Sequence, residues 1–262
     1  MRRSSWLLIS GSILALACTK GGDKAADKPG ADTTTAAAPA PAGPAAIVTV
    51  LYNQPKDPAA FEKYYASTHI PLVVANQSEI GFKRADLTKF ESTLDGKKPT
   101  FYRQAELYFD SMGDLQKGVA TPGFKKVADD LKNFASGGLI GMVATATNEH
   151  GAAEGNEPGA IVTVIYKAPK DTAAFEKYYS ETHIPLVGAS QAEIGFTRAE
   201  LTRFNTNLDG SKPDRYRQAE LYFPSMDAAK KGIATPAFKK VGADLANFAS
   251  GGLDALIGAE TK

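Results

Sequence analysis

Two histidines, His69 and His183, have the side chains best suited to acid–base chemistry in this sequence. Each lies in the same five residues, THIPL, and they are 114 positions apart (183 − 69 = 114). A neutral imidazole in an apolar pocket can act as a general base toward an acidic C–H or a phenol. The same histidines also fit a structural role, in which a side chain at a helix end bonds a terminal carbonyl and packs under neighbouring tyrosines. The sequence shows no partner that decides between these two roles.

Charged and aromatic side chains form a second group of candidates. Arg84 and Glu106 lie on neighbouring predicted strands and would pair across them. Such a pair either orients the carbonyl or hydroxyl of a ligand or fixes an interface between sheets. The tyrosines either line a pocket or fill a core. The candidate ligand-binding residues are Tyr52, Tyr65, Arg84, Glu106 and Tyr108 in the first half of the chain, and Tyr166, Tyr179, Arg198, Glu220 and Tyr222 in the second.

The sequence is a tandem repeat, because the two histidine motifs belong to longer matching segments. IVTVLY at 47–52 returns as IVTVIY at 161–166, and the offset of 114 then holds without a gap. A polar, glycine-rich stretch separates the two copies. We therefore predict a first module at 46–146, a linker at 147–159 and a second module at 160–262.

Within one copy, the spacing of apolar residues predicts four strands and two helices. Asp57 and Pro58 supply an N-cap and a first helical residue, and an apolar face follows at helical spacing, with a potential break at Pro71. The predicted elements are a strand at 47–52, a helix at 58–72, strands at 82–90 and 102–109, a helix at 121–135 and a strand at 139–146. This βαββαβ order predicts a ferredoxin-like α+β module, with two helices on one face of an antiparallel sheet.

The other face of such a sheet needs a partner. Strand alternation directs Ala105 and Leu107 toward the helices, and Tyr102, Glu106 and Tyr108 toward the uncovered face. Large aromatic side chains exposed there would favour association with another surface. The second copy, held on a short linker, supplies that surface at high effective concentration. We therefore expect the two sheets to pack against each other within one chain, as a monomer that contains a pseudo-dimer.

Residues 1–17 have the layout of a bacterial secretory signal. Arg2 and Arg3 precede an uncharged apolar run that is too short to span a bilayer. The run ends in LALAC at Cys18, which resembles a lipobox, with Ala15 where leucine is usual. That resemblance implies cleavage before Cys18 and attachment of acyl chains to it. A plain signal peptide with an incidental cysteine is the alternative interpretation.

The residues that follow indicate how the folded part is held. Cys18 is the only cysteine, so the chain has neither an internal disulfide nor a cysteine nucleophile in its folded part. Residues 18–45 contain no aromatic side chain and are rich in Ala, Pro and Thr, which is typical of a flexible tether. We expect a lipid-anchored protein of the cell envelope, at the outer membrane or the periplasmic face in a two-membrane bacterium.

The first helix resembles the signature of the EthD-like family, named for ethyl tert-butyl ether degradation. FEKYY at 61–65 runs into THIPL at 68–72, like that family's aromatic-rich helix and His-x-Pro-Leu sequence, and 175–179 with 182–186 repeat the pattern. The resemblance covers both modules and implies a dimeric α+β barrel, usually formed by two separate chains. Relatives in that superfamily include cofactor-free oxygenases, polyketide-modifying enzymes, isomerases and haem proteins, so the fold does not fix the chemistry.

These observations lead to two functional hypotheses. The first is an envelope protein that binds a small apolar or aromatic compound in one pocket per module, with His69 and His183 as catalytic bases of a cofactor-free oxidoreductase or isomerase. The second is a non-catalytic lipoprotein that sequesters a ligand or binds a partner. A net charge of +1 with no basic stripe argues against nucleic acid, and three histidines in total leave no clustered zinc site. Nothing beyond the superfamily favours haem, and we expect neither a cofactor nor a metal.

Overall fold

The computed structural model describes residues 45–150 and 159–261. The predicted signal, Cys18, all but the last residue of the tether and most of the linker lie outside the described residues. No helix in the described ranges is long and apolar enough to cross a membrane.

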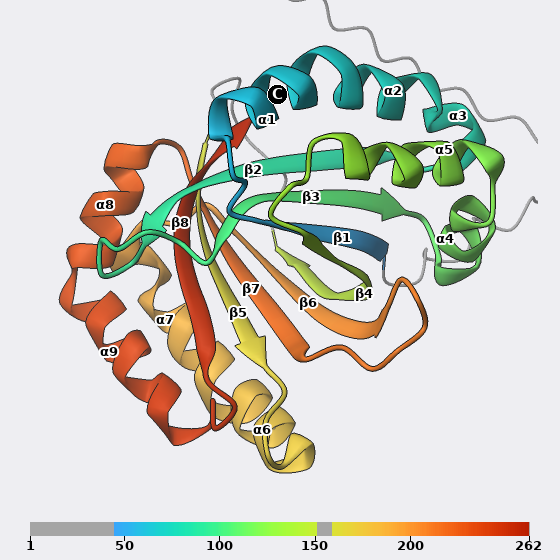
Figure 1. Ribbon diagram of the computed structural model, residues 1–262. Helices are drawn as coiled ribbons and strands as arrows, with labels where there is room; N and C mark the ends of the chain where they lie inside the picture. Colours follow the sequence, from blue (N-terminus) through green and yellow to red (C-terminus); the bar gives the residue numbers. More distant parts are fainter. Residues whose placement is uncertain (1–44, 151–158, 262) are drawn as a thin grey trace, which may run out of the picture. The chain divides into compact units, whose positions relative to one another are not determined.

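The first module contains four strands with helices between them (Figure 1). Its elements are β1 (Ala46–Asn53), α1 (Pro58–Tyr64), η1 (Tyr65–His69), α2 (Ile70–Ala75), α3 (Gln77–Ile80), β2 (Arg84–Thr93), β3 (Phe101–Phe109), α4 (Met112–Val119), α5 (Pro122–Asp130), η2 (Leu131–Asn133) and β4 (Leu139–His150). Compared with the sequence-based elements, α4 is additional and β4 continues to His150.

The second module repeats this order. Its elements are β5 (Ala160–Lys167), α6 (Thr172–Tyr178), η3 (Tyr179–His183), α7 (Ile184–Ile194), β6 (Arg198–Asn207), β7 (Arg215–Phe223), α8 (Met226–Ala234), α9 (Pro236–Asp244), η4 (Leu245–Asn247) and β8 (Leu253–Thr261). Asp57 and Asp171 cap the first helix of each copy, as their side chains accept from the backbone N–H three residues later.

The first helix does not break at Pro71. Residues Tyr65–His69 form a π-turn, in which the Ile70 N–H donates to the Tyr65 carbonyl, and α2 starts directly after it. Proline cannot donate to the helical ladder and clashes with the carbonyl four residues earlier. The wider turn just before Pro71 lets the helical path continue, and it places His69 at the end of the π-turn.

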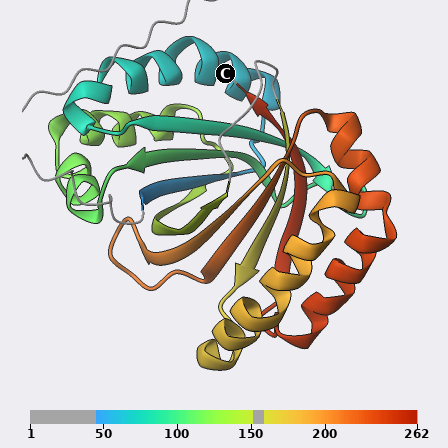
Figure 2. The same ribbon diagram turned by 180° about the vertical axis from the view of Figure 1, so that it is seen from behind.

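The eight strands form a closed barrel in the order β1-β3-β2-β8-β5-β7-β6-β4. Two antiparallel joints connect the modules: β2 pairs with β8, and β4 pairs with β6. The helices of both modules lie outside the strands, as the front and rear views show (Figures 1 and 2). The prediction of two ferredoxin-like modules that form a dimeric α+β barrel within one chain is therefore confirmed.

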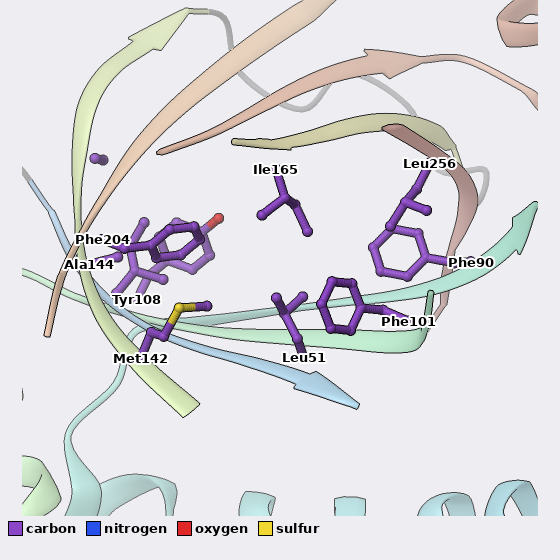
Figure 3. Close-up of a cluster of buried hydrophobic side chains, with 11 residues drawn as sticks. Leu51, Phe90, Phe101, Tyr108, Met142, Ala144, Ile165, Phe204 and Leu256 are labelled. Carbon is purple, nitrogen blue, oxygen red and sulfur yellow. The ribbon is translucent and has the colours of Figure 1, made fainter. Parts of the chain in front are cut away.

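The barrel interior is packed with apolar side chains from both modules. Figure 3 shows Tyr108, Met142 and Phe204 in one group, Phe90, Phe101 and Leu256 in another, and Leu51 with Ile165 between them. One strand departs from simple alternation. The register of β1 and β3 shifts near Asn53, and Tyr102 therefore packs with Tyr52 and Phe61 on the helical side. The expectation that Tyr102 faces the other sheet was wrong.

Candidate functional site

Each module contains an apolar cavity between the outer face of its sheet and its helices. The cavity has a volume of about 260 Å³ in the first module and about 170 Å³ in the second. Both are lined mainly by aliphatic side chains of the sheet and of the helices above it. The predicted site residues that line them are Tyr52, Tyr65, His69 and Arg84 in the first module and Tyr166, Tyr179 and His183 in the second.

A partly buried carboxylate holds the histidine of each cavity. His69 Nδ1 is 2.9 Å from Asp130 Oδ2, and Asp130 Oδ1 accepts from Tyr64 Oη at 2.7 Å and from Asn133 Nδ2 at 2.9 Å. Asp130 is the last residue of α5, which brings it beside the end of the π-turn. In the second module, Asp244 holds His183 Nδ1 at 2.8 Å.

The carboxylate fixes which nitrogen of the neutral imidazole carries the proton. An ionised carboxylate only accepts, so the Nδ1 atom of His69 carries the proton and donates it to Asp130. The Nε2 atom then has a free lone pair, and it has no hydrogen-bond partner in the part of the chain that the structure describes. This is the tautomer that a general base requires at Nε2.

Burial favours the neutral form of this histidine. Desolvation lowers the pKa of His69 below its ordinary value, against the opposing effect of Asp130. His183 shows the same direction for the same reasons. Although desolvation opposes it, hydrogen bonds from His69, Asn133 and Tyr64 hold the pKa of Asp130 below its usual value. At neutral pH, the pair is therefore an ionised aspartate and a neutral imidazole.

Aromatic rings surround the histidine. The ring of Tyr65 stacks on His69 with centroids 5.7 Å apart, and Phe134 lies 4.6 Å from it on a tilted plane. Tyr65 Oη is buried and has no hydrogen-bond partner among the described residues. Burial raises its pKa, so the phenol stays protonated and is available as a donor. Tyr179 repeats this arrangement in the second module.

The remaining site candidates lie in the barrel interior, on the other side of each sheet from the cavities. Neither Glu106 nor Glu220 lines a cavity. Gln104 Nε2 donates to Glu220 at 2.9 Å and Gln218 Nε2 to Glu106 at 3.1 Å, so each glutamate is bonded across the two modules. Tyr108, Tyr222 and Arg198 also belong to this interior network.

The predicted pair of Arg84 and Glu106 does not form. Arg84 Nη2 instead lies 3.3 Å from Asp86 Oδ2 and 3.3 Å from Glu200 Oε2. The strand register explains this, because Arg84 stands opposite Tyr108 and packs on its ring, whereas Asp86 stands opposite Glu106. Burial of several carboxyl groups close together disfavours their ionised forms. Desolvation and the neighbouring acids raise the pKa of Glu106, and burial raises that of Glu220 to about 7.

The sequence analysis missed Asp130 and Asp244. The repeat contains a signal that identifies them: Asp130 is aspartate again at 244, whereas the adjacent Asp129 is replaced by Ala243. No group of three or more His, Cys, Asp or Glu side chains within 45–150 and 159–261 could hold a metal ion.

Two βαββαβ modules closed into one barrel define a dimeric α+β barrel protein. The apolar cavity in each module has the size of a small molecule. The EthD domain model matches this chain twice, at residues 53–138 and 167–252, so the protein belongs to the EthD family. An uncharacterized 11.0 kDa protein from the thcB-thcC intergenic region of Rhodococcus erythropolis is 45% identical over 92 residues. That match covers 35% of this chain and 85% of the relative.

Two solved structures share this fold. A putative monooxygenase from Fusobacterium nucleatum aligns with a TM-score of 0.54 at 13% identity, covering 85% of this chain and 94% of that one. An anthrone oxidase-like protein aligns with a TM-score of 0.55 at 12% identity, covering 84% and 92%. An EthD family protein from Bacillus halodurans is 29% identical over 38% of this chain and 95% of its own, with a TM-score of 0.35.

Proposed function

We propose that this protein binds one small apolar or aromatic compound in each module and removes a proton from it with His69 or His183. The observation that carries this proposal is the same in both copies. A neutral histidine, held by a partly buried aspartate, lines an apolar cavity that is large enough for a small organic molecule.

The first chemical step uses only groups of this chain. The Nε2 lone pair of the histidine takes a proton from an acidic C–H, the C–H electron pair stays on the ligand as a carbanion or enolate, and the aspartate stabilises the imidazolium. Return of the proton to a different carbon completes an isomerisation without another reactant. If the carbanion instead gives its electrons to dioxygen, the same step begins a cofactor-free oxidation, with dioxygen as the oxidant.

A non-catalytic binding protein is the second candidate. The imidazole of His69 is only 3% exposed and packs against two aromatic rings, which also fits a side chain that serves stability. In this case, the cavities would hold a ligand without changing it.

We further propose that the protein is exported and held at the cell envelope by acyl chains on Cys18. The support for this is the N-terminal sequence: two arginines, a short apolar run and the ending LALAC. The tether at 18–45 would hold the barrel away from the lipid surface, and the paired modules would act as a monomer.

The test begins with a ligand search on the purified chain. Phenols and ketones are screened by native mass spectrometry, and the acidic C–H of each bound compound is followed by deuterium exchange in D₂O. We expect two bound molecules per chain and catalysed exchange. The double variant His69→Gln, His183→Gln should lose at least about 100-fold in exchange rate while it still binds.

Two outcomes separate the hypotheses. Exchange that survives in the double variant excludes the histidines as bases. Stoichiometric binding without exchange in the wild type supports the non-catalytic candidate. A control variant, Asp129→Asn, alters an exposed acid that pairs with Lys125, and it should leave the exchange unchanged.

A further inference from the structure

The two cavities differ where they reach the surface. Val74 on α2 and Ala128 on α5 line the first cavity, and the residues at the corresponding positions of the second are Gly188 on α7 and Gly242 on α9. All four residues are exposed, so these positions mark the cavity mouths. Most of the other lining residues are the same or closely similar in the two copies. Among the residues that line the cavities, the two modules therefore differ at the mouths.

Packing does not require the two glycines of the second mouth. A Cβ added at Gly188 or Gly242 would have no atom within 4 Å, and neither residue has a left-handed backbone. Helices α7 and α9 pack against each other (Figure 1), and a glycine inside a helix is less stable than alanine. Both glycines line the cavity that contains His183, and the space where a Cβ would lie is open at each of them.

The mouth of the first cavity has an apolar rim instead. Val74 is 60% exposed and Leu208 is 38% exposed, and they are the exposed large hydrophobic residues of the described ranges. Leu208 comes from the β6–β7 loop of the other module, where its N–H donates to the Gly141 carbonyl at 2.9 Å. Its counterpart, Leu94, is partly buried, packs against the core of the second module and lines the second cavity. Exposed apolar side chains at a cavity mouth are typical of a surface that contacts a ligand.

A polar atom inside the second cavity also points to a ligand. Tyr179 Oη is buried, lacks a hydrogen-bond partner among the described residues and belongs to a side chain that lines this cavity. A buried hydroxyl without a partner is destabilising, and a ligand hydroxyl or carbonyl would satisfy it.

We infer that the two modules bind different members of one ligand class, and that the residue pairs at the mouths determine which. Although its cavity is the smaller of the two, the second module takes a phenol or carbonyl compound whose bulky, branched substituent projects out of the cavity through the open space at Gly188 and Gly242. The first module excludes that substituent with Val74 and Ala128, and it takes compounds with small or unbranched tails. This inference rests on the proposed binding of small molecules in both cavities.

The test uses two phenols with the same head group and different tails. The probes are 4-methylphenol and 4-(1,1,3,3-tetramethylbutyl)phenol, with stoichiometry and affinity measured by isothermal titration calorimetry on the full chain. The variants exchange the mouths: Gly188→Val with Gly242→Ala, and Val74→Gly with Ala128→Gly. Each introduces the residues that the other module already has at exposed positions, and thermal unfolding checks that each variant folds.

The wild type should bind two molecules of 4-methylphenol but only one of the branched phenol. Closing the second mouth should weaken the branched phenol at least about tenfold, which corresponds to about 1.4 kcal/mol, and should leave two sites for 4-methylphenol. Opening the first mouth should add a second site for the branched phenol. This inference alone is overturned if the wild type binds two molecules of 4-methylphenol and neither variant changes the binding of the branched phenol. No binding of either phenol by the wild type overturns the proposed function as well.

Discussion

Replacement of Glu220 with glutamine removes one titrating group from the barrel interior and preserves most of its hydrogen-bond geometry. Glu220 Oε1 accepts from Gln104 Nε2 at 2.9 Å and from Thr163 Oγ1 at 3.3 Å, and a glutamine oxygen can accept both. Burial raises the pKa of Glu220 from its ordinary 4.5 to about 7. The folded chain therefore holds a proton on Glu220 at pH values where the unfolded chain has lost it.

The sign and the size of the effect follow from that difference. Between pH 4.5 and pH 7 the folded state binds more protons, so the free energy of unfolding falls as the pH rises through this window. A difference of about 2.5 pKa units corresponds to about 3 kcal/mol, all of it lost above pH 7. The wild type should therefore lose about 3 kcal/mol more than Glu220→Gln between pH 4.5 and pH 8.

Urea unfolding of both proteins across this pH range measures the difference directly. The lowered pKa values of the histidines act with the opposite sign, but both proteins contain these residues, so their effect cancels in the comparison. Glu181→Gln, at an exposed position, is the control for loss of a carboxylate and should follow the wild-type curve. If the free energy of unfolding changes with pH in the same way for the wild type and for Glu220→Gln, the conclusion that Glu220 is protonated in the folded chain is refuted.

Three further substitutions test the site and its support. Asp130→Asn should lower the stability by about 1–3 kcal/mol in urea and slow any proton exchange at the first cavity, whereas Asp129→Asn should do neither. Tyr65→Phe removes a buried hydroxyl without a partner, so unfolding should show unchanged or slightly higher stability, while the calorimetric affinity for a phenol falls. Gly118→Ala should destabilise by about 2 kcal/mol or more, because its Cβ would collide with the Ile80 carbonyl and the Phe109 ring. The Cβ added in Gly113→Ala would meet only Ser111 Oγ, at 3.7 Å, so this control variant should be tolerated. Thermal unfolding of both glycine variants measures the difference.

Periodicity and the repeat offset predicted two βαββαβ modules whose sheets pack against each other, because each sheet needs an apolar partner surface and the second copy provides one. The closed barrel was implied by the resemblance to the EthD-like family. Periodicity and the offset were insufficient for features that depend on local geometry. Apolar spacing cannot distinguish an α-turn from the π-turn before Pro71, since the extra residue changes the backbone path and not the composition. Strand alternation placed Tyr102 on the wrong side because a register shift in β3 interrupts the period of two.

The candidate site was predicted only in part, for a related reason. His69 and Tyr65 lie on one helical face, so local spacing brings them together. Asp130 is 61 positions further along the chain, and only the packing of α5 against the π-turn places it beside His69. A comparison of the two copies reveals it, because Asp129 changes between the copies and Asp130 does not. Tertiary contacts of this kind need either a structure or a second copy of the sequence.

The fusion of two modules permits an arrangement that a symmetric dimer of identical chains cannot have. Position 86 is aspartate and its counterpart, position 200, is glutamate. The longer Glu200 lies 3.0 Å from Arg198 and 3.3 Å from Arg84 of the other module, and it also accepts from Tyr108 Oη, whereas Asp86 forms a salt bridge with Arg84. One carboxylate therefore serves an arginine of each module. Two identical chains would place the same residue at both positions, and two glutamates there would compete for the same pair of cations. The different cavity mouths follow the same logic, since covalent linkage lets one half of the barrel change while the other half keeps its partner.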